Sequence, residues 1–97
     1  MKIKISILGS TGSIGTTTLK ILDKKKNLFS INLLSANKNF KLIGKQIKKY
    51  KPKIFVVTDK KIFFKIKKKF INSKTKILEN FSKKNLIKSD ITVSSIP

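Results

Sequence analysis

The segment from Gly9 to Gly15, with the sequence GSTGSIG, constrains the fold of this chain more than any other. An apolar β-branched run, Ile3–Leu8, precedes it, and a segment with helical spacing follows it. Glycines between a strand and a helix let the backbone turn sharply and approach a pyrophosphate, which the N–H groups of the helix start bind. The spacing is one residue longer than G-x-G-x-x-G in its first interval, and no Walker A lysine follows. The segment predicts a dinucleotide-binding turn.

Each glycine of this turn has an expected role. Gly9 makes the turn out of the strand, Gly12 lets the backbone lie against the pyrophosphate, and Gly15 allows the helix to pack close to the sheet. The N–H groups of residues 11–14 are the expected phosphate donors. The hydroxyl groups expected to assist them are those of Thr11 and Ser13.

Strand and helix patterns alternate along the whole chain. The expected strands are residues 3–8, 30–34, 53–57, 75–78 and 91–94, and the expected helices are residues 13–26, 40–50, 60–70 and 82–88. This alternation predicts an α/β fold, a Rossmann-like parallel sheet with helices on both faces and a strand order of 3-2-1-4 or close to it. Because such sheets normally continue further, we expect residues 1–97 to be one incomplete domain, truncated after the fourth or fifth strand.

Apolar spacing also predicts how the helices pack and where they end. Lys51-Pro52 ends the second helix, and Thr58 or Asp59 caps the third. The third helix is expected to bury Ile62, Phe63, Ile66 and Phe70. The first is expected to bury Ile14, Thr18, Ile21 and Leu22.

The charge of the chain is extreme, because all 24 basic residues are lysines and the formal net charge is +20. Clustered lysine attracts polyanions, so nonspecific binding at low salt is expected. Arginine, however, is the side chain favoured for bidentate phosphate and guanine contacts, and this chain has none. Lys, Ile and Asn share AT-rich codons. We therefore interpret the charge as genome composition and expect no specific nucleic-acid partner.

The residues that are missing limit the chemistry further. With 97 residues, the chain is too short for an oxidoreductase with separate cofactor and substrate domains. It has no cysteine and no histidine, which excludes disulfides, thiolate metal sites and the commonest general base. No secretory signal or membrane span is present, so a cytoplasmic protein is expected. The four acidic residues are scattered, so we expect no catalytic residue and no metal ligand in this chain.

The end of the second expected strand bears on cofactor choice. NAD-binding sites place an Asp or Glu there to accept from the ribose 2′-hydroxyl. This chain has Asn37-Lys38-Asn39 instead, and no acid nearby. Lys38 would attract the 2′-phosphate of NADPH, and Ser35, Asn37 and Asn39 can donate hydrogen bonds to it. The alternative is that Lys38 is one more surface lysine and that Asn39 only caps the next helix.

Residues 7–22, ILGSTGSIGTTTLKIL, and residues 36–39 resemble the 1-deoxy-D-xylulose 5-phosphate reductoisomerase family. Its chains open with Gly-Ser-Thr-Gly-Ser-Ile-Gly and a helix with Thr-Leu in its first turns, and usually read Ala-Gly-Lys-Asn after the next strand. The resemblance implies a homodimeric enzyme that uses NADPH and a divalent metal, Mg or Mn. It would convert a phosphorylated sugar, 1-deoxy-D-xylulose 5-phosphate, to 2-C-methyl-D-erythritol 4-phosphate in non-mevalonate isoprenoid biosynthesis. The resemblance implies NADPH contacts at Thr11, Gly12, Ser13 and Ile14. Its match at Ala36, Lys38 and Asn39 also favours Asn37, Lys38 and Asn39 as cofactor contacts over the surface and capping alternative.

The chain departs from the family pattern at Asn37, where the family usually has Gly. Asparagine tolerates left-handed backbone angles, so we expect the turn to survive. The family's metal and substrate residues have no counterpart here, so the 97-residue chain alone is expected to be inactive. Two alternatives remain open: the start of another NADP-dependent oxidoreductase such as aspartate-semialdehyde dehydrogenase, or a decayed, non-catalytic basic remnant.

Overall fold

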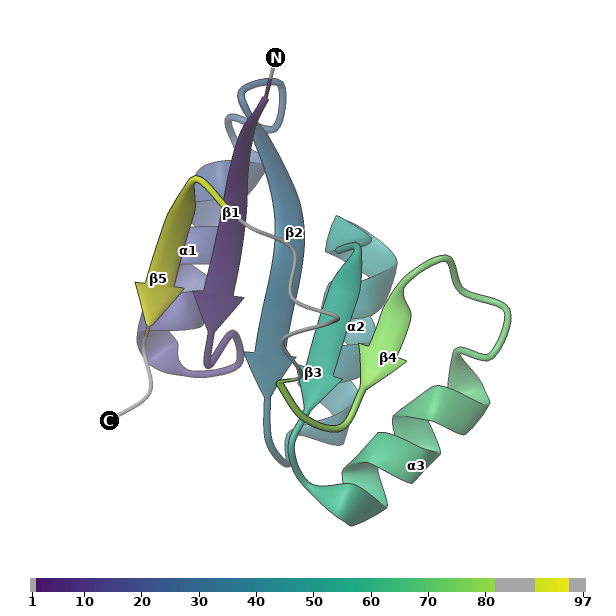
Figure 1. The fold of residues 1–97 in the computed structure, drawn as a ribbon. Helices are drawn as coiled ribbons and strands as arrows, with labels where there is room; N and C mark the ends of the chain where they lie inside the picture. The colour runs from purple at the N-terminus through teal and green to yellow at the C-terminus, as the bar shows by residue number, and fades with distance from the viewer. Residues whose placement is uncertain (1, 82–88, 95–97) are drawn as a thin grey trace.

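A computed structural model describes residues 2–81 and 89–94 of the chain (Figure 1). Strands and helices alternate as expected, and the helix expected over residues 82–88 lies outside the described residues. The elements are β1 (Ile3–Leu8), α1 (Ser13–Asp23), β2 (Phe29–Ala36), α2 (Phe40–Tyr50), β3 (Ile54–Val57), α3 (Lys60–Lys69), β4 (Lys76–Leu78) and β5 (Ile91–Ser94).

The five strands form one parallel sheet in the order β4-β3-β2-β1-β5. The Rossmann-like α/β fold with a parallel sheet predicted from the sequence is confirmed. Helices on both faces stay a prediction, because the three described helices all pack into one apolar cluster and the expected helix over residues 82–88 lies outside the described residues. The expected order was wrong in one respect: the strand beside β1 is β5, whereas β4 extends the opposite edge beside β3. Alternation of strands and helices predicts parallel pairing but carries no signal for the edge at which the next strand is added.

The core lies between the sheet and its helices. Figure 1 shows α1 and α2 behind the sheet. All three described helices contribute to one apolar cluster on β1, β2, β3 and β4, through Leu19 and Leu22 of α1, Ile43 and Ile47 of α2, and Phe63 and Ile66 of α3. A second, smaller cluster consists of Leu33, Ile54 and Val56 with Leu8 and Leu78 packed against it. Strands buried this way read as apolar runs, as IFVV of β3 does. No helix among the described residues is long and apolar enough to cross a membrane.

The buried face of α1 differs from the sequence expectation. Gly15, Leu19 and Leu22 are the buried residues of this helix. Ile14 and Ile21 are 58% and 56% exposed, so their assignment to the core was wrong. The cause lies at the start of the helix, where close packing of Gly15 against the preceding loop turns Ile14 outward. In a chain so rich in isoleucine, an apolar side chain alone is a weak sign of burial.

The boundaries of α1 and β2 also differ from those expected from the sequence. The first helix ends at Asp23 and not near residue 26, because residues 24–28 form turns closed by bonds from Lys25 N to Leu22 O and from Leu28 N to Lys25 O, both 2.9 Å. β2 runs from Phe29 to Ala36, longer than residues 30–34. It pairs with β1 from the Ile3–Phe29 register to Leu8–Ser35.

The expected C-terminal end of α2 and the expected N-terminal cap of α3 are confirmed. Lys51 ends α2 in the left-handed region, with φ of 47°, directly before Pro52. Asp59, one of two candidates for the cap of α3, accepts a hydrogen bond from Ile62 N at 3.1 Å. Phe63 and Ile66 of α3 are buried, with Ile62 and Phe70 packed partly against the same cluster.

Candidate functional site

Three loops meet at the carboxyl edge of the sheet. Residues 9–12 follow β1, residues 37–39 follow β2, and Thr58 follows β3. The strand ends are in register, since Leu8 pairs with Ser35 and Ala36 with Val57. In open α/β sheets, ligands bind beyond the carboxyl ends of the strands, so this edge is the candidate site.

The turn after β1 is attached to the end of β2. Gly9 has φ of 80°, a conformation that favours glycine, and its N–H donates to Ser35 O at 3.0 Å. The N–H of Ser10 donates to the same oxygen at 2.7 Å. The expected role of Gly9, to turn the chain out of β1, is confirmed.

Gly15 allows α1 to approach this turn closely. A Cβ added to Gly15 would lie 2.4 Å from Gly9 O and 2.7 Å from Ser10 Cα. No side chain fits at these distances, so the glycine is a packing requirement. The close approach predicted for Gly15 is confirmed, and its partner is the backbone of the turn itself.

The start of α1 offers hydrogen-bond donors. Gly12 is the N-cap, no side chain caps the helix, and its first turn contains no acidic residue. The first helical bond runs from Thr16 N to Gly12 O at 2.9 Å. The preceding N–H groups of an α-helix have no intrahelical partner and suit an anion.

The expected donors are not all equivalent. The N–H of Gly12 donates to Gly9 O at 3.1 Å and so stabilises the turn. No backbone bond from the N–H groups of Thr11, Ser13 or Ile14 is found among the described residues. Ser13 and Ile14 are exposed and Thr11 is half-buried, which leaves these amides and both hydroxyls available to a ligand.

A buried polar pair behind the turn was missed from the sequence. Ser10 Oγ donates to Gln46 Oε1 at 2.6 Å, and Gln46 Nε2 donates to Ser10 O at 2.8 Å. Gln46 lies between Ile43 and Ile47 on the inward face of α2. A polar residue at an inward helical position was the available signal.

In the loop after β2, the side-chain oxygens of Asn37 and Asn39 accept hydrogen bonds within the chain. Asn37 Oδ1 accepts from Thr58 Oγ1 at 3.2 Å, while the N–H of Thr58 donates to Ala36 O at 3.0 Å. Asn39 Oδ1 caps α2 by accepting from Leu42 N at 3.2 Å, so the capping alternative is confirmed for this oxygen. The carboxamide nitrogens of Asn37 and Asn39 still face no described partner.

The backbone of Asn37 does not behave as its glycine counterpart in the family would suggest. Among the described non-glycine residues, only Lys51 has a positive φ. The turn expected to survive at Asn37 is therefore closed without a left-handed residue. The loop closes without it because Thr58 holds both the backbone carbonyl before Asn37 and its side chain.

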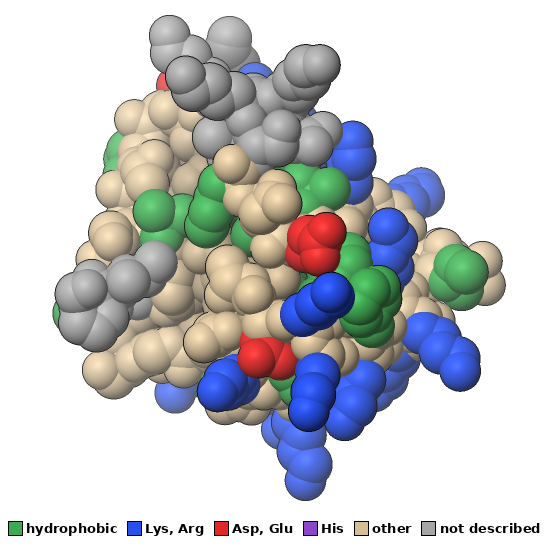
Figure 2. All heavy atoms as spheres, turned by 60° about the horizontal axis from the view of Figure 1, so that its bottom comes forward, with side chains coloured by type: hydrophobic (Ala, Val, Ile, Leu, Met, Phe, Trp, Pro, Cys, Tyr) green, Lys and Arg blue, Asp and Glu red, His purple; other side chains and the backbone are tan. Residues whose placement is uncertain are grey.

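Lysines surround one part of this edge. Figure 2 turns the edge toward the viewer and shows lysine side chains gathered on the side where α3 lies. A hollow between the 37–39 loop and the start of α3 is lined by Lys38, Asp59, Lys60, Lys61 and Lys65, with Ile62 and Phe64. We call it the Lys38 hollow. No carboxylate lies between Ser35 and Asn39, so the end of β2 favours an anion over a ribose hydroxyl.

The acidic residues serve structural roles. Asp23 pairs with Lys49 at 3.6 Å, and Asp90 Oδ2 accepts from Lys4 N at 2.9 Å. Asp59 caps α3, and Glu79 is exposed. The described residues contain no group of three His, Cys, Asp or Glu side chains that could hold a metal ion.

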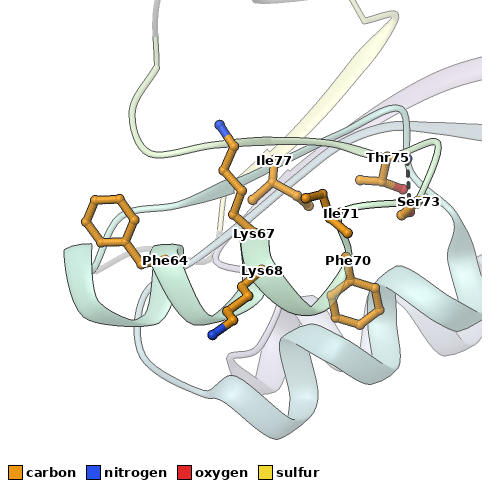
Figure 3. A pocket seen from close by; sticks show the side chains of 8 residues that line it. All are labelled: Phe64, Lys67, Lys68, Phe70, Ile71, Ser73, Thr75 and Ile77. Atoms are coloured by element: carbon orange, nitrogen blue, oxygen red, sulfur yellow. Dashed lines mark hydrogen bonds between the residues drawn. The ribbon is translucent and has the colours of Figure 1, made fainter.

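A second hollow lies beside α3 and β4 (Figure 3). Phe64, Phe70 and Ile71 line it, Lys67 and Lys68 extend in opposite directions, and Thr75 N donates to Ser73 Oγ at 3.1 Å. Its lining is mostly apolar, and it does not border the loops after β1 and β2. We therefore place the site at the carboxyl edge.

Comparisons with known proteins point to one enzyme family. A family model described as 1-deoxy-D-xylulose 5-phosphate reductoisomerase matches residues 5–95. The reductoisomerase of Pelagibacter ubique (strain HTCC1062) is 44% identical over 84 residues, which cover 87% of this chain and 22% of that protein. The enzyme of Halothermothrix orenii is 36% identical over 96 residues, which cover 99% of this chain and 23% of that protein.

Solved structures of reductoisomerases share the fold of this chain. The reductoisomerase from Zymomonas mobilis in complex with NADPH matches with a TM-score of 0.75 and 26% identity, covering 80% of this chain and 21% of that chain. A reductoisomerase in complex with magnesium matches with a TM-score of 0.72 at 24% identity, a likeness of fold alone. The chain spans about a fifth of the length of these relatives.

Proposed function

Because this chain belongs to the 1-deoxy-D-xylulose 5-phosphate reductoisomerase family, we propose that it binds NADPH at the carboxyl ends of β1 and β2. The observation that carries the proposal is the uncapped start of α1, which Gly15 brings against the Gly9–Ser10 backbone. Its free N–H groups suit a pyrophosphate. The family match does not favour an aspartate-semialdehyde dehydrogenase.

The seven expected contact residues divide into two groups. Thr11, Gly12, Ser13 and Ile14 would hold the pyrophosphate at the start of α1. Asn37, Lys38 and Asn39 would hold the ribose and its 2′-phosphate at the end of β2. The residues present fit this group, since Gly12 and Lys38 are exposed and the first turn of α1 contains no acidic residue. Asp59, the carboxylate that lines the Lys38 hollow, accepts from Ile62 N as the cap of α3.

NADPH supplies the hydride when bound, and the part of this chain is to place it. The proposed reaction of the whole protein is the conversion of 1-deoxy-D-xylulose 5-phosphate to 2-C-methyl-D-erythritol 4-phosphate. The divalent metal that this reaction requires in the family finds no ligand cluster among the described residues, so we assign no step to it here. The homodimer and the cytoplasmic location stay predictions from family membership.

Titration calorimetry of the 97-residue chain with NADPH and NADH tests the proposal. NADPH should bind more tightly, and Lys38→Ala should remove most of the difference, about 1–3 kcal/mol for a charge-assisted contact. Lys24→Ala, an exposed lysine after α1, is the matched control and should leave it unchanged. A folded chain that binds neither cofactor would overturn the proposal and favour a non-catalytic basic remnant.

A further inference from the structure

The Lys38 hollow brings together side chains from two separate elements. Lys38 comes from the loop after β2, whereas Lys60, Lys61 and Lys65 come from the first turns of α3. All four are exposed. Sequence reasoning assigned only Lys38 to the site, because the other three belong to a lysine-rich helix face.

The two elements are joined directly, so the hollow has a defined shape. Thr58, which immediately precedes the α3 cap, donates from its N–H to Ala36 O at 3.0 Å and from Oγ1 to Asn37 Oδ1 at 3.2 Å. These bonds hold the start of α3 beside the residue before Lys38. These hydrogen bonds are therefore the reason why Lys38 and the lysines of α3 are neighbours.

The lysines of the hollow are not paired with other charged or aromatic side chains among residues 2–81 and 89–94. None of its four lysines forms an ion pair or a cation–π contact among the described residues, where these interactions involve Lys49, Lys67 and Lys69. The one carboxylate in the hollow, Asp59, is engaged by Ile62 N at 3.1 Å as the cap of α3. Four ammonium groups face one carboxylate, which leaves a site for a dianion.

We propose that Lys60, Lys61 and Lys65 act with Lys38 to bind the 2′-phosphate of NADPH and so determine the preference for NADPH over NADH. The inference rests on the proposed function, because dinucleotide-binding folds place the ribose 2′ position at the end of the second strand. A phosphomonoester carries up to two negative charges, and one exposed lysine neutralises only part of them. Three further lysines supply the remainder without a bidentate arginine.

Two small probes isolate this contact. 2′,5′-ADP carries the 2′-phosphate and 5′-AMP lacks it, so the ratio of their dissociation constants measures recognition of that group. The test variant is Lys60→Gln/Lys61→Gln/Lys65→Gln. The matched control is Lys24→Gln/Lys25→Gln/Lys26→Gln, which removes the same charge from exposed residues at the opposite end of the sheet.

The test variant should bind 2′,5′-ADP at least about tenfold more weakly, since it removes three charges, each contributing up to about 1 kcal/mol in water, and 1.4 kcal/mol is tenfold. Its affinity for 5′-AMP should stay within about twofold of the unmodified chain. The control should change both affinities little and equally. Thermal unfolding of both variants confirms that each is folded.

The outcomes separate this inference from the proposed function. If the unmodified chain prefers 2′,5′-ADP and the test variant behaves like the control, Lys38 recognises the phosphate without α3, and the inference is overturned while NADPH binding stands. If the unmodified chain binds both probes equally, it does not recognise the 2′-phosphate, and the inference is overturned while dinucleotide binding stands. If the folded chain binds neither probe, the proposed function is overturned as well. A loss of 2′,5′-ADP affinity of equal size in the control would show general charge attraction and would also overturn the inference.

Discussion

Ser10 and Gln46 hold each other through two hydrogen bonds, of 2.6 Å from Ser10 Oγ and 2.8 Å from Gln46 Nε2. Both residues are buried, at 0% and 3% exposure. Ser10 belongs to the turn that would receive the pyrophosphate, and Gln46 belongs to α2, which begins at the loop carrying Lys38. One polar contact therefore links the two halves of the candidate cofactor site.

Gln46→Ala should destabilise the chain by about 1–3 kcal/mol, because it leaves the hydroxyl and carbonyl of Ser10 buried without partners. The free energy of unfolding in urea measures this. Lys45→Ala, the exposed neighbour on the same helix, should change it by less than about 0.5 kcal/mol. Equal effects of the two substitutions would contradict a structural role for the pair.

Two glycines of the chain should respond to alanine in opposite ways. Gly15→Ala forces a Cβ to within 2.4 Å of Gly9 O and should cost about 1–3 kcal/mol, together with cofactor affinity. Gly44→Ala meets only the Phe70 ring, at 3.5 Å from Cζ and 3.6 Å from Cε2, which are ordinary contacts, and should stabilise α2 by up to about 1 kcal/mol.

Thermal unfolding with and without NADPH checks both glycine variants. Only Gly15→Ala should reduce the stabilisation that the cofactor provides, because Gly44 lies on α2 away from the start of α1. A tolerated alanine at Gly15 would show that the turn can move outward, and the close packing would then not be required.

The order of the elements was predictable because strand and helix periodicities differ and survive the biased composition. The buried face of α1 was not predictable. Ile14 and Ile21 match the apolar pattern, but the contact of Gly15 with the backbone of the turn sets the orientation of the helix. The position of β5 beside β1 was not predictable either, because the periodicity of the apolar residues does not indicate on which edge of the sheet a strand is added.

The part of the candidate site that the local backbone forms was predictable from the sequence. The part that depends on tertiary contacts was not. The glycine spacing identified the turn and the N-terminal donors of α1. The bonds of Thr58 to Ala36 and Asn37 join residues more than twenty positions apart, so no local pattern contains them. The grouping of α3 lysines with Lys38 depends on that same contact.

Asn39 has a capping oxygen and a free carboxamide nitrogen, and two substitutions separate these roles. Asn39→Asp keeps the cap, so stability should be retained, but its charge should weaken NADPH binding more than NADH binding. Asn39→Ala should lose about 1 kcal/mol of stability through the lost cap. Calorimetry and urea unfolding measure the two effects. An aspartate variant that binds NADPH normally would place the 2′-phosphate away from this residue.

A polypeptide of these 97 residues should bind NADPH without oxidising it. The described residues offer no cluster of metal-binding side chains, and Asp23, Asp59 and Asp90 are each engaged in an ion pair or a backbone contact. Incubation with 1-deoxy-D-xylulose 5-phosphate, magnesium and NADPH should leave the absorbance of the reduced cofactor constant. Quenching of protein-bound NADPH fluorescence by added NADP in the same sample controls for binding. Turnover above the protein-free rate would show that this segment carries chemistry beyond placing the cofactor.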